Sequence, residues 1–139
     1  MPIDAWTEPL GRLRHVITID AHTVVADMAV PGGDDTGPSS HDYFDASLLA
    51  CMGQTAIMYA RLHALPLERV HLHAERDASR EREGTYLLNV VIDLEGDITD
   101  AQRARMLQIV GRCPIHKLMT TATIEIHTVE GGRFQAPPE

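Results

Sequence analysis

The sequence predicts an α+β domain with the order strand–strand–helix–strand–strand–helix–helix–strand. Three observations support this prediction. Residues 41–64 contain no proline and only one glycine, which is typical of a long helix. Segments in which apolar and polar residues alternate, as in half-buried strands, lie on both sides of this helix. Two shorter segments with helix-capping residues follow toward the C-terminus.

The N-terminal part of the chain is predicted to form a β-hairpin followed by a loop. Residues 14–20 and 23–30 are the two strands, and Asp20-Ala21-His22 provides the turn between them. Residues 31–38 have the sequence PGGDDTGP, a run of turn formers that must be a loop.

The long helix has local signals at both ends. Ser39 or Ser40 is the predicted N-cap, because a side-chain oxygen there accepts a hydrogen bond from the first turn. The helix should end at about Ala64, because Leu65 precedes Pro66 and the residue before a proline disfavours the helical conformation.

The C-terminal half is predicted to combine strands with short helices. Thr99-Asp100-Ala101-Gln102 fits a capping box, in which the threonine and glutamine side chains satisfy backbone N–H groups at a helix start. Gly111 should end this helix, and Cys113-Pro114 should begin another, because proline is well placed at the first helical position. The predicted elements are strands at 70–75 and 86–94, helices at 99–110 and from 114, and a closing strand at 121–129.

Composition and charge limit the possible partners. The formal net charge of −8 disfavours nucleic acid and anionic membrane surfaces. Residues 1–10 lack the pattern of a signal peptide, and no apolar stretch reaches the roughly 18 residues of a membrane span. We therefore expect one cytoplasmic domain over residues 1–139, with a core at about 12–129 and a loose tail at 131–139. In that reducing compartment the two cysteines would be unrelated buried thiols or a reversible redox pair.

Cys51 lies on an apolar stripe of the long helix. At about 100° per residue, the side chains within about 60° of it are Phe44, Leu48, Thr55, Met58 and Leu62. Cys51 could therefore be a small hydrophobe on a core face, or a thiol at the floor of a pocket for an apolar substrate. A second stripe of mostly small residues could pack inside the chain or against a helix of a second copy; it comprises Ala46, Ala50, Gly53, Ile57 and Ala60.

Local electrostatics favour Cys113 as the more acidic thiol. It is the predicted N-cap of the Pro114 helix, with His116 and Lys117 in the next turn, and these features lower a thiol pKa. Cys51 lies about 15 Å from the start of its helix, where the helix dipole has little effect. His71 and His73 share one side of a strand, but with no third ligand nearby a solvated sheet face is the simpler interpretation, and we expect no metal.

Three segments together resemble the OsmC/Ohr superfamily of peroxide-stress and organic hydroperoxide resistance proteins. The first is the loop at 32–39, GGDDTGPS, leading into the helix that carries Cys51. The second combines Tyr59-Ala60-Arg61 with the segment LPLERV at 65–70. The third combines DAQRAR at 100–105 with RCPIHK at 112–117. Each segment alone is a weak signal, but their order and spacing match over most of residues 12–129.

The resemblance implies an OsmC-like fold in which antiparallel sheets wrap around the long central helices of an intertwined homodimer. It also implies a thiol-dependent peroxidase for organic hydroperoxides, and possible activity on hydrogen peroxide. In such proteins the helix cysteine, here Cys51, is oxidised to a sulfenic acid. The cysteine of the Cys-Pro motif, here Cys113, then forms a disulfide with it. A dithiol reductant, often lipoyl-linked in this superfamily, restores the pair, and no cofactor is needed.

The sequence departs from the family pattern around the reactive thiol. Studied members hold the thiolate with an arginine and with a glutamate ten positions before the cysteine, where this chain has His41 followed by Asp42. Asp42 lies on the opposite side of the helix from Cys51 and fits a helix N-terminal charge. Arg12 and Arg14 are the nearest candidates for the arginine.

These residues define the candidate site and its alternatives. The expected polar support comes from His41 and Arg14, and the expected apolar wall from Phe44, Leu48 and Met58. The missing glutamate leaves open an OsmC-like protein with a degenerate site that binds a small apolar ligand or a protein partner. A redox sensor, in which the disulfide changes a surface, is a third hypothesis.

Overall fold

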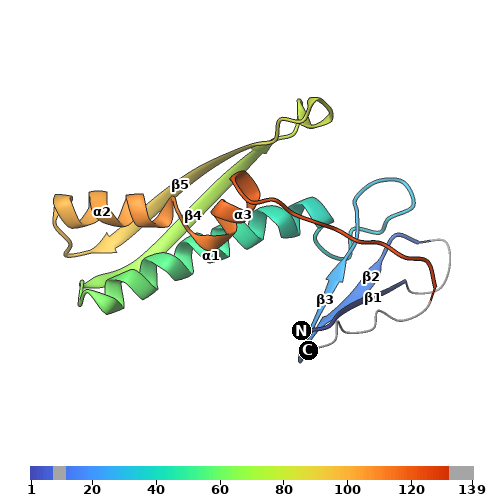
Figure 1. The fold of residues 1–139 in the computed structure, drawn as a ribbon, viewed down its shortest axis with the longest axis horizontal. Helices are drawn as coiled ribbons and strands as arrows, with labels where there is room; N and C mark the ends of the chain where they lie inside the picture. The colour runs from blue at the N-terminus through green and yellow to red at the C-terminus, as the bar shows by residue number, and fades with distance from the viewer. Residues whose placement is uncertain (8–11, 132–139) are drawn as a thin grey trace.

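The computed structural model describes residues 1–7 and 12–131 and contains two antiparallel sheets with helices packed beside one of them (Figure 1). One sheet has the strand order β1 (Ile3–Thr7), β2 (His15–Ile19) and β3 (His22–Ala26). The other is a hairpin of β4 (Leu67–Asp77) and β5 (Leu87–Gly96), with the short 3₁₀ turn η1 (Glu81–Glu83) at its tip. The helices are α1 (Ser40–Leu62), α2 (Asp100–Val110) and α3 (Pro114–Thr120).

The elements divide into a helical body and a separate sheet. Helix α1 runs along β4 and contacts α2 and α3. The β1–β2–β3 sheet lies beyond the N-terminal end of α1, away from the β4–β5 hairpin (Figure 1). The chain that follows α3 runs back toward this sheet (Figure 1). Because few residues cover the faces of this sheet, apolar surface is exposed there. Exposed apolar surface of this kind is typical of a site of assembly.

The α+β class with antiparallel sheets is confirmed, and so are the hairpin, the long helix and the two shorter helices. Strand β1 was not predicted. It is five residues long and exposed along its whole length, so burial imposes no clear alternation on its sequence. The bounds of the predicted strands also differ from the prediction, most of all those of β3 and β4. Strand β3 ends at Ala26 because Asp27 begins the loop, and β4 extends at both ends because its pairing with β5 runs from Leu67 to Asp77.

The predicted closing strand at 121–129 is wrong for the single chain. Residues 122–129 have no regular secondary structure and no strand partner in the part of the chain that the structure describes. The alternation in the sequence is real, but a strand also needs the backbone of a neighbour to form a ladder. Ile124 and Ile126, which a sheet would bury, are 63% and 82% exposed. The predicted tail beyond residue 131 lies outside the described residues.

Both predicted capping motifs are present. Ser39 is the N-cap of α1: its Oγ accepts the Asp42 N–H, and the Asp42 carboxylate accepts the Ser39 N–H at 2.9 Å. Asp42 is therefore the helix N-terminal charge that its position predicted. Thr99 and Gln102 form the same reciprocal pair at the start of α2. Each such cap contributes about 1 kcal/mol to the helix it begins.

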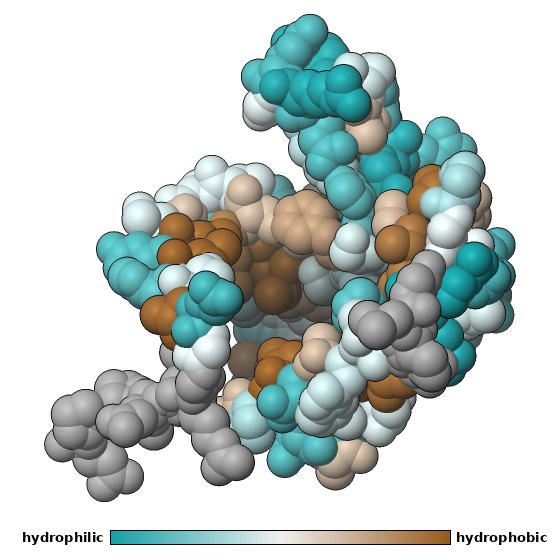
Figure 2. Space-filling model, turned by 90° about the vertical axis from the view of Figure 1, so that its right-hand side faces the viewer, coloured by the Kyte–Doolittle hydropathy of each residue, from teal (hydrophilic) through white to brown (hydrophobic). Residues whose placement is uncertain are grey.

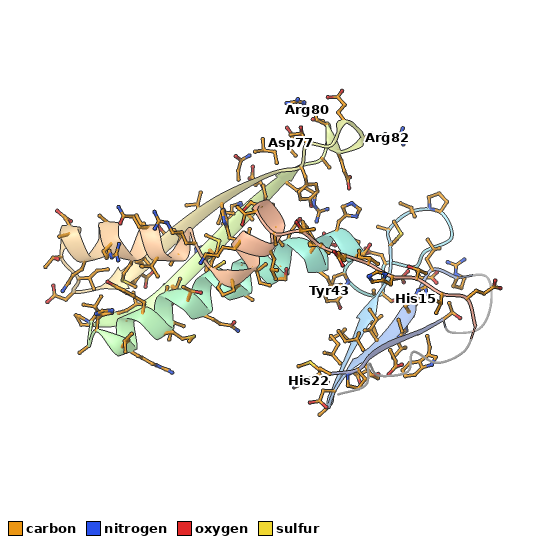
Figure 3. The ribbon with its side chains drawn as sticks, in the orientation of Figure 1. His15, His22, Tyr43, Asp77, Arg80 and Arg82 are labelled. Atoms are coloured by element: carbon orange, nitrogen blue, oxygen red, sulfur yellow. The ribbon has the colours of Figure 1, made fainter. Side chains whose placement is uncertain are left out.

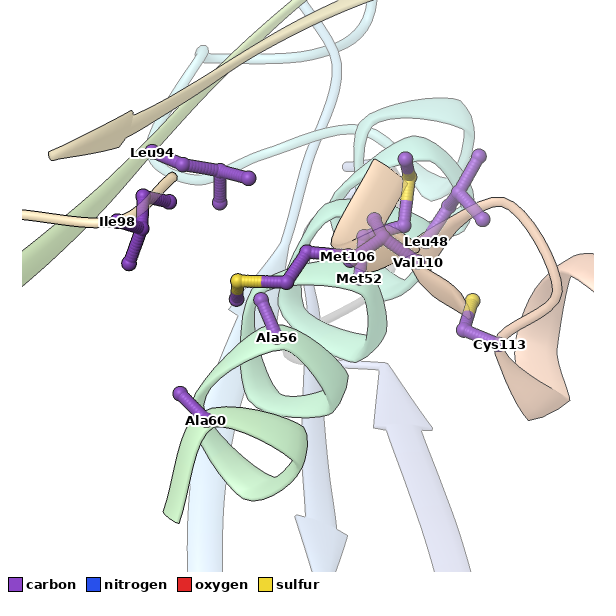
Figure 4. Packing of buried hydrophobic residues seen from close by; sticks show 9 residues of the cluster. All are labelled: Leu48, Met52, Ala56, Ala60, Leu94, Ile98, Met106, Val110 and Cys113. Carbon is purple, nitrogen blue, oxygen red and sulfur yellow. The ribbon is translucent and has the colours of Figure 1, made fainter. Parts of the chain in front are cut away.

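The core lies between α1, α2 and the β4–β5 hairpin (Figure 4). Helix α1 contributes one buried face, which meets side chains from β5, from the β5–α2 connection and from α2. Met106 of α2 is fully buried at the centre of this cluster. The buried apolar residues are Leu48, Met52, Ala56, Ala60, Leu94, Ile98, Met106, Val110 and Cys113.

The stripe of small residues on α1 is packed inside the chain at some positions and exposed at others. A side chain at Gly53 would place its Cβ 3.2 Å from Cδ1 of Leu72, so this part of the stripe packs against β4. Ala60 is also buried, whereas Ala46 and Ala50 are exposed. The predicted close approach is therefore made partly by β4, and the exposed part remains available to another helix.

A polar cluster of Asp42, Asp45, Arg76 and Tyr86, here the Asp45 cluster, joins the start of α1 to the hairpin. Arg76 Nε donates to Asp45 Oδ2 at 2.6 Å, Arg76 Nη2 donates to Asp42 Oδ1 at 2.7 Å, and the Tyr86 hydroxyl donates to Asp45 Oδ1 at 2.6 Å. Burial and the Asp45 carboxylate raise the pKa of Tyr86 to about 12. Hydrogen bonds from Ser39 and then Arg76 lower the pKa of Asp42 to about 2. The cluster thus carries fixed charges at neutral pH.

The loop between β3 and α1 is organised by the buried carboxylate of Asp27. This side chain accepts the Thr36 hydroxyl at 2.6 Å and the backbone N–H groups of Met28, Asp34 and Thr36. The Thr36 hydroxyl is the largest of the influences that lower the pKa of Asp27 to about 2. Gly33 is required, because a Cβ there would clash with the Met28 carbonyl oxygen. The ordered loop fixes where α1 begins.

Candidate active site

The fold brings the two cysteines into contact. Cys51 lies in the middle of α1 and is half-buried, whereas Cys113 is the N-cap of α3 and is completely buried. Both thiols are free, and Cys51 packs against the buried cluster that contains Cys113, close enough to influence the pKa of that thiol. The packing of α2 and α3 along α1 makes this contact, since the two residues are far apart in the sequence.

Burial raises the pKa of Cys113, whereas its N-cap position had predicted an acidic thiol. The Cys113 pKa is raised, first by loss of solvent and then by the neighbouring Cys51, although the backbone N–H of His116 lies 3.4 Å from its sulfur and acts in the opposite direction. The N-cap position is as predicted, but α3 has only seven residues and its few N–H groups do not offset desolvation. Cys113 is therefore held in its protonated form.

A groove of about 820 Å³, here the Cys51 groove, opens beside the half-buried thiol. Its volume is in the range of pockets that bind small organic molecules. Most of its lining comes from the C-terminal half of α1, and α2 and α3 each add one residue. The lining residues are Cys51, Gln54, Thr55, Met58, Tyr59, Arg61, Leu62, Ile109 and Pro114. The surface is mainly apolar, with polar groups near the thiol and a single charged residue, Arg61, among them.

The predicted apolar wall is only partly in this groove. Met58 lines it and is 69% exposed. Leu48 lies in the core beneath α1, where it is buried. Phe44 lies on α1 nearer to its N-terminus than Cys51. It lines a second pocket of about 430 Å³, together with His41, Glu81 and Tyr86. Its ring meets that of Tyr86 edge to face, with centroids 5.7 Å apart.

The predicted polar supports also lie away from Cys51 within one chain. His41 Nε2 is 2.7 Å from Glu81 Oε1, which ties the start of α1 to the tip of the hairpin. Arg14 directly precedes β2 of the separate sheet and is partly buried. Arg12, the other arginine considered, forms an ion pair with Asp34 in the loop before α1. A single chain therefore does not bring these residues to the thiol.

The histidines of β4 take part in surface ion pairs. His71 Nδ1 lies 3.7 Å from Asp93, and His73 Nε2 lies 3.4 Å from Glu75, with all four side chains exposed. Within residues 1–7 and 12–131, no group of three or more His, Cys, Asp or Glu side chains is arranged to hold a metal ion. No helix in these ranges combines the length and hydrophobicity needed to cross a bilayer.

Several lining residues were missed from the sequence. Gln54 and Arg61 lie on the flank of α1, about 60° and 80° from Cys51 on the helical wheel, just at or beyond the limit of the apolar stripe. A wider sector of the wheel would have included them. Ile109 and Pro114 belong to other helices, and no local pattern points to their contact with the groove.

Fold and site together define an α+β protein in which two reduced cysteines meet beside an apolar groove. The chain belongs to the OsmC-like protein family, whose profile matches residues 32–128. This family includes organic hydroperoxide resistance proteins. A comparison with curated protein sequences gave no significant match.

Solved structures with the same fold come from several bacteria. An OsmC-like protein from Mycoplasma pneumoniae is 15% identical, with 86% of each chain covered and a TM-score of 0.71. The organic hydroperoxide resistance protein OsmC of Legionella pneumophila is 17% identical, with 86% of this chain and 88% of that chain covered and a TM-score of 0.61. The organic hydroperoxide resistance protein OhrB of Bacillus subtilis is 19% identical, with 86% and 90% covered and a TM-score of 0.56. At these identities the likeness establishes the fold.

Proposed function

We propose that the protein is a thiol-dependent peroxidase that reduces organic hydroperoxides, with Cys51 as the attacking thiol and Cys113 as the resolving thiol. The observation that carries the proposal is the contact between a half-buried and a fully buried reduced cysteine at the edge of an apolar groove. Cys51 lines the groove and Cys113 is buried beside it, which is the arrangement that an attacking thiol and a resolving thiol require. Membership of a family that includes organic hydroperoxide resistance proteins gives further support.

The first step transfers one oxygen atom to sulfur. The Cys51 thiolate attacks the terminal oxygen of R–O–O–H, the S–O bond forms and the O–O bond breaks. Sulfur loses two electrons and becomes a sulfenic acid, while the peroxide gains them and leaves as an alkoxide that takes a proton to give the alcohol. With hydrogen peroxide the same step releases water. Cys51 is suited to this step because it lines the groove, whereas Cys113 is completely buried.

The second step closes a disulfide. The Cys113 sulfur attacks the sulfenic sulfur, its proton leaves with the hydroxyl group as water, and the Cys51–Cys113 bond forms. The raised pKa keeps Cys113 protonated, so its S–H can donate to a negatively charged Cys51 sulfur before the reaction. A dithiol reductant, such as a lipoyl-linked one, then reduces the disulfide and leaves oxidised as a cyclic disulfide. The cycle fits the reducing cytoplasm, which returns such a pair to the dithiol state.

Less than one equivalent of oxidant should be enough to produce the predicted bond. After substoichiometric cumene hydroperoxide, mass spectrometry of the digested protein is expected to show the Cys51 and Cys113 peptides linked, with the loss of two hydrogen atoms. In Cys113→Ser the reaction should stop at a Cys51 sulfenic acid, which a dione reagent traps. Hydroperoxide consumption by the wild-type protein without any linked peptide would contradict the resolving role of Cys113.

We further propose that the chain works as a homodimer whose two copies complete the site. Large apolar side chains are exposed on the separate sheet and on the segment after α3, including Trp6 at 54% and Ile126 at 82%. Hydrophobic side chains also gather around a hollow on the face shown in Figure 2. Residues 122–129 keep the alternation of a strand without a partner in one chain, so pairing with a second copy would bury Ile124 and Ile126 and satisfy their backbone groups.

A twofold axis would also bring the remaining predicted residues to the groove. If two copies of α1 cross in antiparallel fashion near the exposed Ala50, the N-terminal half of each helix faces the C-terminal half of the other. The partner's His41 and Phe44 would then lie opposite the Cys51 groove, which accounts for their absence from the groove of their own chain. We propose the partner's Arg14 as a further polar contributor, and Leu48 as support for the groove from the core below.

The assembly has a direct test. Sedimentation of the purified protein is expected to give twice the mass of one chain. Ile126→Glu should shift this equilibrium strongly toward the monomer, because a charge would be buried in the interface. Val91→Glu is the matched control, since Val91 is 59% exposed on the outer face of β5. A wild-type monomer, or equal behaviour of the two variants, would contradict the proposed interface.

A further inference from the structure

Positive charge is concentrated in one segment of this acidic chain. Residues 101–124 contain four Lys and Arg side chains and no Asp or Glu, so the segment carries a formal charge of +4. The rest of the chain has 8 Lys and Arg against 20 Asp and Glu, a net charge of −12. The segment covers most of α2, the turn that follows it, α3 and the first residues after α3. Its cations are Arg103, Arg105, Arg112 and Lys117.

Three of these cations form an exposed face, here the basic rim, which consists of Arg105, Arg112 and Lys117. All three are exposed, whereas the partly buried Arg103 donates to the Leu94 carbonyl oxygen at 2.6 Å. Within residues 1–7 and 12–131, no carboxylate forms an ion pair with any member of the rim. The three charges are therefore available to attract a negatively charged surface.

The basic rim borders the Cys51 groove. Ile109 and Pro114 line the groove on the side formed by α2 and α3. Arg105 and Arg112 precede and follow Ile109 by four and three residues, so all three lie on the same side of α2 and its continuing turn. Lys117 follows Pro114 by three residues on α3, which places it one turn further along the same side. The rim therefore lies beside the opening through which the sulfur atoms are reached.

The proposed catalytic cycle defines what such a face would bind. Each turnover leaves a disulfide between Cys51 and Cys113, and a dithiol must supply two electrons to reduce it. The groove of about 820 Å³ has room for a small dithiol on a flexible arm but not for a folded protein. A protein that carries the dithiol must therefore stay outside the groove, against its rim. An acidic carrier would be attracted by the rim and repelled by the rest of a chain whose net charge is −8, so these charges would also orient it.

We propose that the basic rim docks an acidic protein that carries the reducing dithiol. This inference rests on the proposed peroxidase function and adds to it the place and the charge of the reductant's docking surface. In the docked complex one dithiol sulfur attacks the Cys51–Cys113 bond and forms a mixed disulfide, which the second dithiol sulfur then breaks. The two protons of the dithiol end on Cys51 and Cys113, and the carrier leaves as a cyclic disulfide. The rim speeds the encounter without touching the reacting sulfur atoms.

The test uses protein that has first been oxidised to the disulfide, so that only its reduction is measured. The two reductants are free dihydrolipoamide, which is uncharged, and a dihydrolipoyl-carrying domain of net negative charge. Arg105→Gln combined with Arg112→Gln should slow reduction by the domain about tenfold at low ionic strength and leave reduction by free dihydrolipoamide unchanged. Arg105→Lys combined with Arg112→Lys should keep most of the rate, because the charges remain. Added salt should slow the wild type toward the glutamine variant.

Arg80→Gln combined with Arg82→Gln is the matched control. It removes the same number of arginine charges at the tip of the β4–β5 hairpin, away from α2 (Figure 3). Because these charges do not border the groove, the rate of reduction by the domain should stay within about twofold of the wild-type rate.

The outcomes separate this inference from the function on which it rests. A wild-type protein that forms no disulfide with a hydroperoxide would end the proposed peroxidase function, and the docking surface with it. A domain that reduces the wild type and the Arg105/Arg112 glutamine variant equally fast would leave the peroxidase in place and overturn the docking surface. Equal slowing with the domain and with free dihydrolipoamide would also overturn it, because that pattern indicates a change at the sulfur atoms. Rim-dependent binding to phosphatidylglycerol vesicles, without a faster reaction with the domain, would assign the rim to a lipid surface instead.

Discussion

Replacing Cys51 with serine is expected to abolish thiol-dependent consumption of organic hydroperoxides, with a fall in rate of at least about a thousandfold. A serine hydroxyl keeps the size of the side chain but is almost never ionised near neutral pH, so it cannot attack the O–O bond. Cys51 lines the groove, and no other free thiol in the described residues does so. The measurement is the rate of cumene hydroperoxide loss in the presence of a dithiol.

Cys113→Ser is the matched control for this experiment. It makes the same sulfur-to-oxygen change at the buried neighbour and should retain the first oxidation of Cys51, at close to one equivalent per chain. Later turnover should then depend on whether the dithiol reduces the sulfenic acid directly. Full activity in Cys51→Ser would exclude the proposed mechanism, and loss of the first equivalent in Cys113→Ser would show that the roles have been reversed.

Asp45→Asn is expected to lower the free energy of unfolding by about 2–3 kcal/mol. Asp45 is 8% exposed and accepts hydrogen bonds from Arg76 and Tyr86, each at 2.6 Å. The amide keeps the shape of the side chain but removes the charge, so it leaves Arg76 with Asp42 alone. It also turns an N–H donor toward another donor. Chemical denaturation at one fixed protein concentration measures the change, since the stability of a dimer depends on concentration.

The control is Asp93→Asn on the outer face of β5. Asp93 Oδ2 lies 3.7 Å from His71 Nδ1, and both side chains are 67% exposed. A surface pair of this kind contributes about 0–1 kcal/mol, so the same substitution should have little effect there. Equal losses for the two variants would mean that the Asp45 cluster does not join α1 to the hairpin as the structure indicates.

Local signals in the sequence were enough to predict most elements. The Ser39 cap, the Thr99–Gln102 capping box and Pro114 at the start of α3 were predicted and are present. Each depends on hydrogen bonds within a few residues, which the side chains at those positions determine directly. The loop at 31–38 was equally clear, because its glycines and prolines exclude regular structure over the whole segment.

Strand formation at the two ends of the chain was not predictable in the same way. Strand β1 exists because β2 offers it an antiparallel edge, and residues 122–129 lack such an edge in one chain although their alternation is better. A strand is stabilised by its neighbours, and the sequence of the strand alone does not say whether a neighbour is present. Whether residues 122–129 form a strand therefore depends on whether a second copy of the chain supplies the neighbouring strand.

The sequence by itself determined the helices, the loop before α1 and the presence of Cys51 and Met58 on one helix face. Only the tertiary structure decided that Cys113 meets Cys51 and that Arg61 lies at the end of the same groove. It also reversed the expected acidity of Cys113, because the cost of burying a thiolate exceeds the stabilisation that a short helix start supplies. Caps and helix faces follow from short-range contacts, whereas burial and charge pairing depend on which distant segments pack together.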